Sequence, residues 1–141
     1  MPGIGPIFRA WSADEPAKYP GPGSDPEAPG YFPPVGGVRL LISTFNPGYG
    51  MQAAAEDEEL QASAPDVADA MEDDAPGMHT TDTTDFEVIL TGTVIMELDD
   101  GVEVKLGPGD VVVQNGTRHR WKNPGPEAST MAVFMVGAHR R

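Results

Sequence analysis

Two short blocks decide the fold of this chain: HTTDTTD at residues 79–85 and HRWKN at residues 119–123. Between them, short runs rich in β-branched residues alternate with glycine turns. Short strands at close spacing, separated by Gly and Pro turns, indicate an all-β sandwich or barrel. A small barrel of this kind is expected to carry both histidines and a carboxylate into one cavity.

The loop at residues 99–101 fixes the register of one hairpin. Apolar residues alternate with polar ones on both sides of it. A three-residue loop pairs Leu98 with Val102 and Met96 with Val104, which keeps both apolar faces together. Gly101 supplies the positive φ that such a loop needs. Further strands are predicted at residues 38–45, 86–91, 111–114 and 130–137.

The N-terminal segment has a different composition. Residues 1–34 hold nine of the fifteen prolines, which predicts an irregular Pro-rich arm with a short strand near residues 7–11. Its aromatic residues Trp11, Tyr31 and Phe32 either pack against the domain or contact a second subunit. The barrel itself is predicted over residues 35–138.

Residues 51–77 interrupt the β pattern. They are rich in Ala and acidic residues, and their large apolar residues are few. Residues 53–63 favour a helical turn or two, and Val67 and Met71 are spaced for one helical face. The segment lacks the apolar stripe of a docked helix, so we expect an acidic insertion that is partly helical or disordered. A second hypothesis is that it folds over the cavity as a lid.

Composition bounds the function. The 141 residues predict one domain, and the chain has no cysteine, which excludes disulfides and thiolate metal sites. The formal net charge is −13, and residues 40–104 hold sixteen of the twenty-two acidic residues and no Lys or Arg. Such a field repels nucleic acid and anionic lipid. With no signal-like or membrane-spanning stretch, a soluble cytoplasmic protein with neither of those partners is expected.

The first block and the residues after it resemble the first motif of the cupin family of small jelly-roll barrels. That motif is His-x-His, then a Glu three or four residues later, then a Gly after six more. His79 matches the first His, Asp85 stands at the Glu position and Gly92 follows at the expected spacing. Thr81 stands where the family has its second His.

The second block completes the resemblance. Here the family has Gly-Asp, a turn that ends in Gly, and then His followed four residues later by Asn. Gln114 stands where a Pro is usual. The matching residues are Gly109, Asp110, Gly116, His119 and Asn123. The resemblance implies a single cupin jelly-roll barrel that self-associates as a homodimer, whose exposed sheet edges would also need cover.

The resemblance also implies a metal site. His79, Asp85 and His119 stand at three of the four ligand positions of the family. Two imidazoles and a carboxylate suit a divalent metal such as Fe, Zn, Mn or Ni. The departure at Thr81 leaves a metal-free polar pocket as the alternative. No organic cofactor is expected.

Further side chains are candidates for a role beside these. Glu87 shares the face of Asp85 and can act as an acid if it points inward, or lie exposed at the rim. Thr81, Gln114 and Trp121 are candidate substrate contacts, with turn or core packing as their alternatives.

Two classes of function fit these residues. The first is a cupin-type enzyme in which His79, Asp85, Glu87 and His119 act on an oxygenated organic molecule such as a keto acid, lactone or polyketide-like compound. Isomerisation, dehydration, decarboxylation and dioxygenation remain open, and a place in small-molecule biosynthesis is implied by the resemblance alone. The second is a non-catalytic ligand-binding module with a degenerate metal site.

Overall fold

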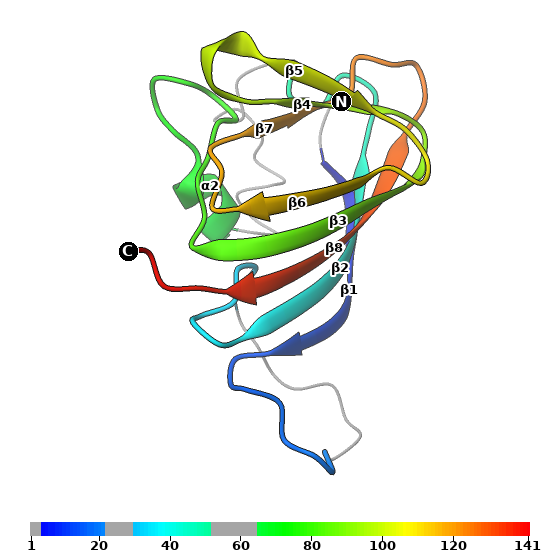
Figure 1. The fold of residues 1–141 in the computed structure, drawn as a ribbon. Helices are drawn as coiled ribbons and strands as arrows, with labels where there is room; N and C mark the ends of the chain where they lie inside the picture. Colours follow the sequence, from blue (N-terminus) through cyan, green and yellow to red (C-terminus); the bar gives the residue numbers. More distant parts are fainter. Residues whose placement is uncertain (1–3, 22–29, 52–64) are drawn as a thin grey trace.

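The computed structural model of the chain describes residues 4–21, 30–51 and 65–141. Its strands form a five-stranded sheet of order β1-β2-β8-β3-β6 and a three-stranded sheet of order β5-β4-β7 (Figure 1). Neighbouring strands in both sheets run antiparallel. The predicted all-β barrel is confirmed, and helix is confined to a few residues of the described chain.

The strands of the described chain are short, and most fall where the sequence predicts them. They are β1 (Ile4–Ala13), β2 (Val38–Phe45), β3 (Thr83–Thr91), β4 (Val94–Glu97), β5 (Glu103–Leu106), β6 (Val111–Asn115), β7 (Arg120–Lys122) and β8 (Ser129–Gly137). The described residues also contain the helix α2 (Pro65–Ala70) and the 3₁₀ turn η2 (Asp99–Gly101).

The core lies between the two sheets. Buried and less buried side chains alternate along β2 and β8, as the two-residue period of a strand requires. Leu41 and Met131 of the larger sheet belong to the same buried cluster as Val94 and Trp121 of the smaller one. The site described below lies in this inter-sheet space.

The hairpin between β4 and β5 has the predicted register. Met96 pairs with Val104, and the amide of Leu98 donates to the carbonyl of Val102 at 2.8 Å. Gly101 has the expected positive φ of 72°. Asp100 is left-handed as well, with a φ of 60°.

The N-terminal arm contains the predicted strand, but the strand is longer than predicted. Residues 4–13 form a ten-residue edge strand, longer than the predicted residues 7–11, that pairs along the whole of β2. Proline is tolerated at such an edge because the missing N–H breaks no ladder bond. Buried Arg39 holds three described residues of the arm, because it donates to the carbonyls of Ala13, Gly30 and Phe32.

The acidic insertion is partly helical, as predicted, but it has a docking face that the sequence did not indicate. Residues 65–70 form helix α2, whose Val67 is buried against Tyr31, Phe32 and Met71. The aromatic residues of the N-terminal arm give this short helix an apolar contact, so it docks without the long apolar stripe that the insertion lacks. The helical turn predicted at residues 53–63 lies outside the described residues.

Within the part of the chain that the structure describes, no helix has the length and hydrophobicity needed to cross a membrane.

Candidate functional site

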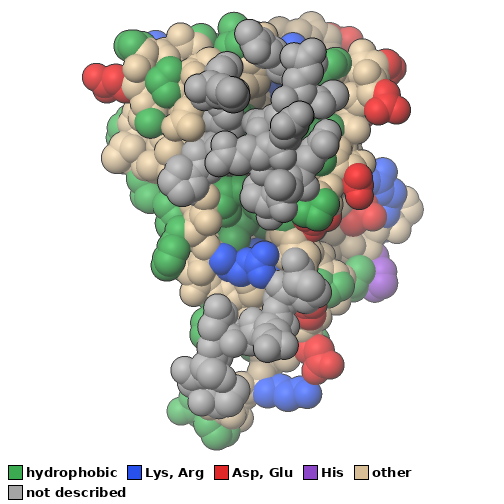
Figure 2. Space-filling view, turned by 180° about the vertical axis from the view of Figure 1, so that it is seen from behind, with side chains coloured by type: hydrophobic (Ala, Val, Ile, Leu, Met, Phe, Trp, Pro, Cys, Tyr) green, Lys and Arg blue, Asp and Glu red, His purple; other side chains and the backbone are tan. Residues whose placement is uncertain are grey.

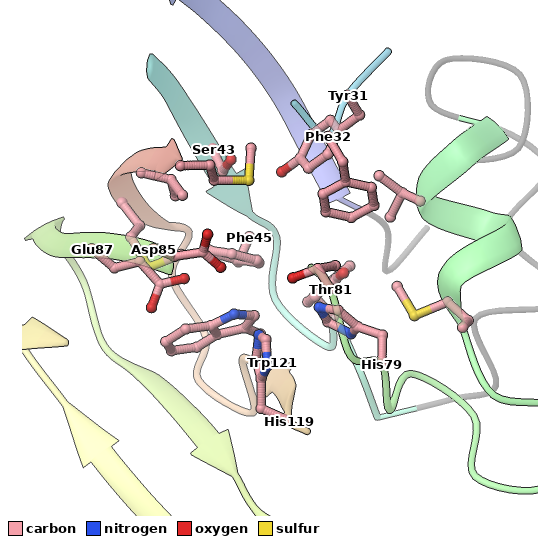
Figure 3. Close-up of a pocket in the computed structure, with 16 residues that line it drawn as sticks. Tyr31, Phe32, Ser43, Phe45, His79, Thr81, Asp85, Glu87, His119 and Trp121 are labelled. Carbon is pink, nitrogen blue, oxygen red and sulfur yellow. The ribbon is translucent and has the colours of Figure 1, made fainter. Parts of the chain in front are cut away.

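A narrow cavity lies between the sheets, with Val67 of α2 in its lining (Figure 3). Its volume is about 50 Å³, which is room for a few water molecules. A larger ligand must therefore displace lining side chains. The lining consists of Tyr31, Phe32, Ser43, Phe45, Tyr49, Val67, Met71, His79, Thr81, Asp85, Glu87, His119, Trp121, Met131, Val133 and Met135.

The two histidines lie side by side in this lining. His79 and His119 are bridged by reciprocal backbone hydrogen bonds of 3.0 Å, and their ring centroids are 4.3 Å apart. Each Nδ1 lies within hydrogen-bond distance of a backbone carbonyl, that of Gly77 at 3.0 Å and that of Thr117 at 2.7 Å. A carbonyl only accepts, so each Nδ1 carries the proton and each Nε2 keeps a free lone pair.

Burial keeps both imidazoles neutral. It lowers the pKa of His79 and, together with the charge of the neighbouring His79, lowers the pKa of His119 to about 3. The pair is therefore a source of two acceptor nitrogens at neutral pH.

Two carboxyl groups face the cavity from β3. Asp85 and Glu87 are two residues apart, so they share the inner face of the strand, and both are at least 95 % buried. Burial raises the pKa of Asp85 to about 6, against the lowering effect of a hydrogen bond from Thr83. Burial and the charge of Asp85 raise the pKa of Glu87 to about 8. The prediction that Glu87 points inward rather than to a rim is confirmed.

Asp85 has an unused acceptor atom. Its Oδ1 is buried and has no hydrogen-bond partner among the described residues. A buried oxygen of this kind costs about 1–3 kcal/mol when unpaired, so a ligand that donates a hydrogen bond here gains that amount.

The other predicted contacts are divided between the cavity and its surroundings. Trp121 lines the cavity and belongs to the core, so both of its interpretations hold. Thr81 lines the cavity, and its hydroxyl is hydrogen-bonded to that of Thr83 at 2.8 Å. Gln114 does not line the cavity; its Nε2 donates to Glu87 Oε2 at 3.3 Å. Its position is that of a residue that orients Glu87.

Aromatic side chains from the N-terminal arm cover the cavity. Tyr31 and Phe32 line it, and their backbone amides donate to Oδ2 of Asp66 in α2 at 2.5 and 3.1 Å. Burial raises the pKa of the Tyr31 hydroxyl to about 12, so this group stays protonated. In Figure 3 the two rings lie between α2 and the strands that carry the polar residues.

From the sequence these two aromatic residues were predicted only to pack against the domain or to contact a second subunit. The sequence also did not identify the wall of the cavity that is formed by the strands beside β3. Ser43, Phe45, Met131, Val133 and Met135 line the cavity from β2 and β8. Their signal is present in the sequence, because they are alternate residues of strands whose inner face adjoins that of Asp85 and Glu87. The register pairs Asp85 with Met135 and Glu87 with Val133. Recognising these residues requires the order of the strands in the sheet, which cannot be read from the sequence.

The predicted metal ligands do not converge in this structure. His79 and His119 are neighbours, but Asp85 lies with Glu87 on the other side of the cavity (Figure 3). Among the described residues, no group of three His, Asp or Glu side chains is placed to hold one ion. The residues present thus offer two imidazole nitrogens and not the three-ligand set that a stable site of this type needs.

Comparison with known proteins agrees with the motifs. A family profile described as "Cupin domain" matches residues 70–136. Oryzines biosynthesis cluster protein J of Aspergillus oryzae is 37% identical over 61 residues, which is 43% of this chain and 34% of that protein. Phomopsin biosynthesis cluster protein C' of Diaporthe leptostromiformis is 41% identical over 59 residues, 42% of this chain and 31% of that protein. The chain thus spans about a third of the length of these curated relatives.

A solved structure shares the fold over most of the chain. The crystal structure of a Cupin 2 conserved barrel domain protein from Salinispora arenicola superposes with a TM-score of 0.52 at 19% identity. The match covers 94% of this chain and 75% of that one. The likeness therefore extends beyond the residues that the family profile covers.

Proposed function

Since residues 70–136 form a cupin domain within a cupin barrel, we propose that the chain is a proton-transfer enzyme of small-molecule biosynthesis. Its substrate is an uncharged, oxygenated organic molecule, and its reaction is a dehydration or an isomerisation next to a carbonyl group. The observation that carries the proposal is the pair of buried carboxyl groups, Asp85 and Glu87, on the cavity face of β3.

The two carboxyl groups suit opposite roles. With a pKa of about 8, Glu87 is protonated at neutral pH and can act as general acid. With a pKa of about 6, Asp85 is mostly ionised at the same pH and can act as general base. Environments that push two neighbouring pKa values apart are the usual origin of an acid and a base in one site.

A dehydration uses both groups once. Asp85 takes a proton from the carbon beside the carbonyl, the electron pair forms the double bond, and the hydroxyl on the next carbon leaves as water with the proton of Glu87. The base ends protonated and the acid ionised, and exchange with solvent restores both. The Nε2 atoms of His79 and His119 accept hydrogen bonds from hydroxyl groups elsewhere on the substrate.

The charge of the lining selects the substrate class. No Lys or Arg stands among the described residues that line the cavity. The carboxylate of a keto acid would lie beside two buried carboxyl groups, with no cationic side chain to pair with it, which is unfavourable. Five aromatic and three methionine side chains supply apolar contact instead. A lactone or a polyketide-like ketone fits better than a keto acid.

The relatives supply the setting of the proposal. Two matched proteins are named after clusters for the biosynthesis of small molecules. These names state no reaction, so the chemistry proposed here rests on the cavity of this chain.

A second candidate function is a non-catalytic binding module. The observation that favours it is the incomplete ligand set, with Thr81 at the position of the second His and no three-ligand group among the described residues. In that case the same carboxyl and imidazole groups bind a ligand and release it unchanged.

The test uses a matched pair of compounds, a phenyl-substituted β-hydroxy ketone and the corresponding β-hydroxy acid. We expect the ketone to raise the melting temperature of the protein and to be converted to the enone, while the acid does neither. Asp85→Asn and Glu87→Gln should lower turnover about 100-fold or more. Glu127→Gln makes the same Glu-to-Gln change at an exposed position and should leave turnover unchanged.

The outcomes separate the two functions. Binding of the ketone without turnover in the unmodified protein would assign the binding module. Neither binding nor turnover with uncharged ketones would contradict both. In either function His119→Ala should weaken ligand binding more than Thr81→Ala, because His119 presents a free Nε2 whereas the Thr81 hydroxyl is already bonded to Thr83.

A further inference from the structure

Two hydroxyl groups of the cavity lining have no part in the proton transfer described above. They belong to Tyr31 of the N-terminal arm and Ser43 of β2. In Figure 3 both side chains lie across the cavity from His119, and the hydroxyl of Tyr31 points into the cavity. Hydroxyl groups donate hydrogen bonds without carrying a charge, which neither the carboxylate of Asp85 nor the acceptor nitrogens of the histidines can do.

Ser43 is a buried polar residue whose hydroxyl is unused. Its neighbours on the inner face of β2 are Leu41 and Phe45, which both belong to the apolar core. Ser43 is 1% exposed, and its Oγ has no hydrogen-bond partner among the described residues. A buried hydroxyl without a partner destabilises a fold, and alanine at this position would avoid that loss. The Ser43 hydroxyl is therefore available to a ligand in the cavity.

The hydroxyl of Tyr31 lies close to Ser43 and to the two carboxyl groups of β3. Burial raises its pKa to about 12, against the lowering effect of the Ser43 hydroxyl, and the charges of Glu87 and Asp85 raise the pKa further. The two hydroxyl groups are neighbours, although Ser43 Oγ does not reach the geometry of a hydrogen bond. Tyr31 keeps its proton at neutral pH, so it is a second neutral donor at the same place.

The surroundings of Tyr31 fix the position of its hydroxyl. The backbone amide donates to Asp66 Oδ2 at 2.5 Å. The ring meets that of Phe32 edge to face, with centroids 4.9 Å apart, and packs against the core. A donor that is held in place before the reaction needs no reorganisation when charge develops beside it.

A carbonyl oxygen that becomes negative during the reaction suits these two donors. When Asp85 removes the proton from the carbon next to the carbonyl group, its negative charge moves to the carbonyl oxygen. The net charge of the cavity does not change, so neutral donors are sufficient there. Acidic side chains at the surface, coloured red in Figure 2, are solvated by water. The charge in the cavity is buried, where a hydrogen bond to it is stronger.

We propose, on the basis of the function proposed above, that the hydroxyls of Tyr31 and Ser43 donate to the carbonyl oxygen of the substrate and stabilise the negative charge that develops on it. Asp85 takes the proton, the C–H electron pair forms a double bond to the carbonyl carbon, and the C=O electron pair moves onto the oxygen. As the C=O bond forms again, the β-hydroxyl leaves as water with the proton of Glu87. Tyr31 and Ser43 keep their own protons throughout.

The first test compares variants that each lack one hydroxyl group. Tyr31→Phe should lower kcat for the β-hydroxy ketone about 100-fold and leave KM nearly unchanged, because the hydrogen bond strengthens as the oxygen becomes charged. Ser43→Ala should also lower kcat, by about tenfold to 100-fold, yet raise the melting temperature, since it removes an unpaired buried hydroxyl. The control is Tyr19→Phe, which makes the same change at a tyrosine of the arm that is 100% exposed and should alter neither quantity.

The second test needs no turnover. The phenyl-substituted ketone without the β-hydroxyl group cannot lose water, and the infrared stretch of its isotopically labelled carbonyl falls in frequency with each hydrogen bond that the oxygen accepts. We expect the stretch of the bound ketone to lie at a higher frequency in Tyr31→Phe and in Ser43→Ala than in the unmodified chain. Tyr19→Phe should match the unmodified chain.

Together the two tests distinguish the hydroxyl pair from the enzyme function. Turnover that persists unchanged in both Tyr31→Phe and Ser43→Ala would overturn the hydroxyl pair and leave the enzyme standing. A bound ketone that is never converted, but whose carbonyl stretch shifts in the two variants, would reject the enzyme and support the hydroxyl contact. One and the same stretch in all the proteins, or no binding of the ketone at all, would overturn the proposal.

Discussion

At the scale of single residues, the buried pair on β3 makes the stability of the fold depend on pH. The pKa of Glu87 is about 8 in the fold, against 4.5 for the free side chain. Between these values the folded chain holds a proton that the unfolded chain has released. The contribution of this proton to the free energy of unfolding is fully present below about pH 4.5, and it is lost as the pH rises to about 8.

Glu87→Gln should remove this dependence. Glutamine does not titrate, and its side-chain oxygen can still accept from Gln114. We expect the variant to be more stable than the unmodified chain at about pH 8.5, by on the order of a few kcal/mol, and the difference to shrink towards about pH 5. Urea unfolding at several pH values measures it.

The pKa shifts of the other buried groups cancel when Glu87→Gln is compared with the unmodified chain. Asp85 also has a raised pKa, and the lowered pKa values of the two histidines destabilise the fold in acid, but both proteins share these effects. Glu127→Gln, at an exposed position, should show no such trend. Parallel stability curves for Glu87→Gln and the unmodified chain between about pH 5 and 8 would mean that Glu87 is not buried as described.

At the scale of single residues, Thr81 is the position at which the metal-ligand set of the family is incomplete. With two converging imidazoles and a distant carboxylate, we expect the dialysed chain to retain much less than one Fe, Zn, Mn or Ni ion. Thr81→His adds a third imidazole to the cavity wall beside the pair and should bind about one Zn or Ni ion per chain, because three or four ligands make a stable site.

Elemental analysis of the dialysed proteins measures the metal content without any assay of activity. Thr81→His combined with His119→Ala is the control and should lose the ion again. A full ion in the unmodified chain that disappears in Asp85→Asn would show that the three-ligand set does assemble, contrary to the arrangement of the side chains here.

The motif residues were the part of the site that sequence could predict. Their spacing placed His79, Asp85 and His119 at one cavity, and alternation along a strand placed Glu87 beside Asp85. Sequence could not show that the carboxylate turns away from the histidines, because this depends on how β3 is stacked against the bridge between residues 79 and 119. Asn123 matches the motif for a structural reason, since its Nδ2 donates to the carbonyls of Phe45 and Glu127.

At the scale of elements, helix α2 holds the two aromatic residues that cover the cavity. Asp66 Oδ2 accepts from the amides of Tyr31 and Phe32, and a hydrogen bond to a charged group contributes about 1.5–3 kcal/mol. Asp66→Ala should release the two aromatic residues, speed hydrogen exchange of their amides and accelerate entry of a ligand into the narrow cavity.

The control for this change lies on the same helix. Asp69 is exposed, and Asp69→Ala removes an equal charge without touching the arm. Amide exchange followed by NMR or mass spectrometry distinguishes the two variants. Equal exchange at residues 31 and 32 in both would show that Asp66 does not hold the cover. The wider hypothesis that the insertion at residues 51–77 acts as a lid stays a prediction.

The strands were easier to predict than the segments around them. Residues 38–45 read as a strand because apolar side chains and flanking turns are local signals, and the structure agrees to the residue. Helix α2 depends on a partner more than thirty residues away, and β1 depends on β2 for its ladder. Local composition therefore predicted only a short strand in the arm and a partly helical or disordered insertion, since it carries no record of such partners.

At the scale of the whole molecule, the charge of the chain determines how association responds to salt. Two copies of net charge −13 repel each other. The outward side chains of β2, β8, β3 and β6 are uncharged, so in the homodimer that the cupin resemblance implies, a contact through the outer face of the five-stranded sheet contains no ion pair that salt would weaken. Raising the ionic strength from about 0.01 M to about 0.15 M shortens the Debye length from about 30 Å to about 8 Å. The dimer should therefore tighten with salt, by about tenfold or more in its dissociation constant.

Sedimentation equilibrium at the two salt concentrations measures this change. The double variant Asp73→Asn and Asp74→Asn removes two exposed charges that lie outside the five-stranded sheet, and it should form a tighter dimer at low salt with a smaller salt effect. An interface built from charge pairs would show the opposite sign, because screening weakens attraction between unlike charges. A dimer that dissociates as salt is added would thus place the contact on a charged surface and not on the outer face of the five-stranded sheet.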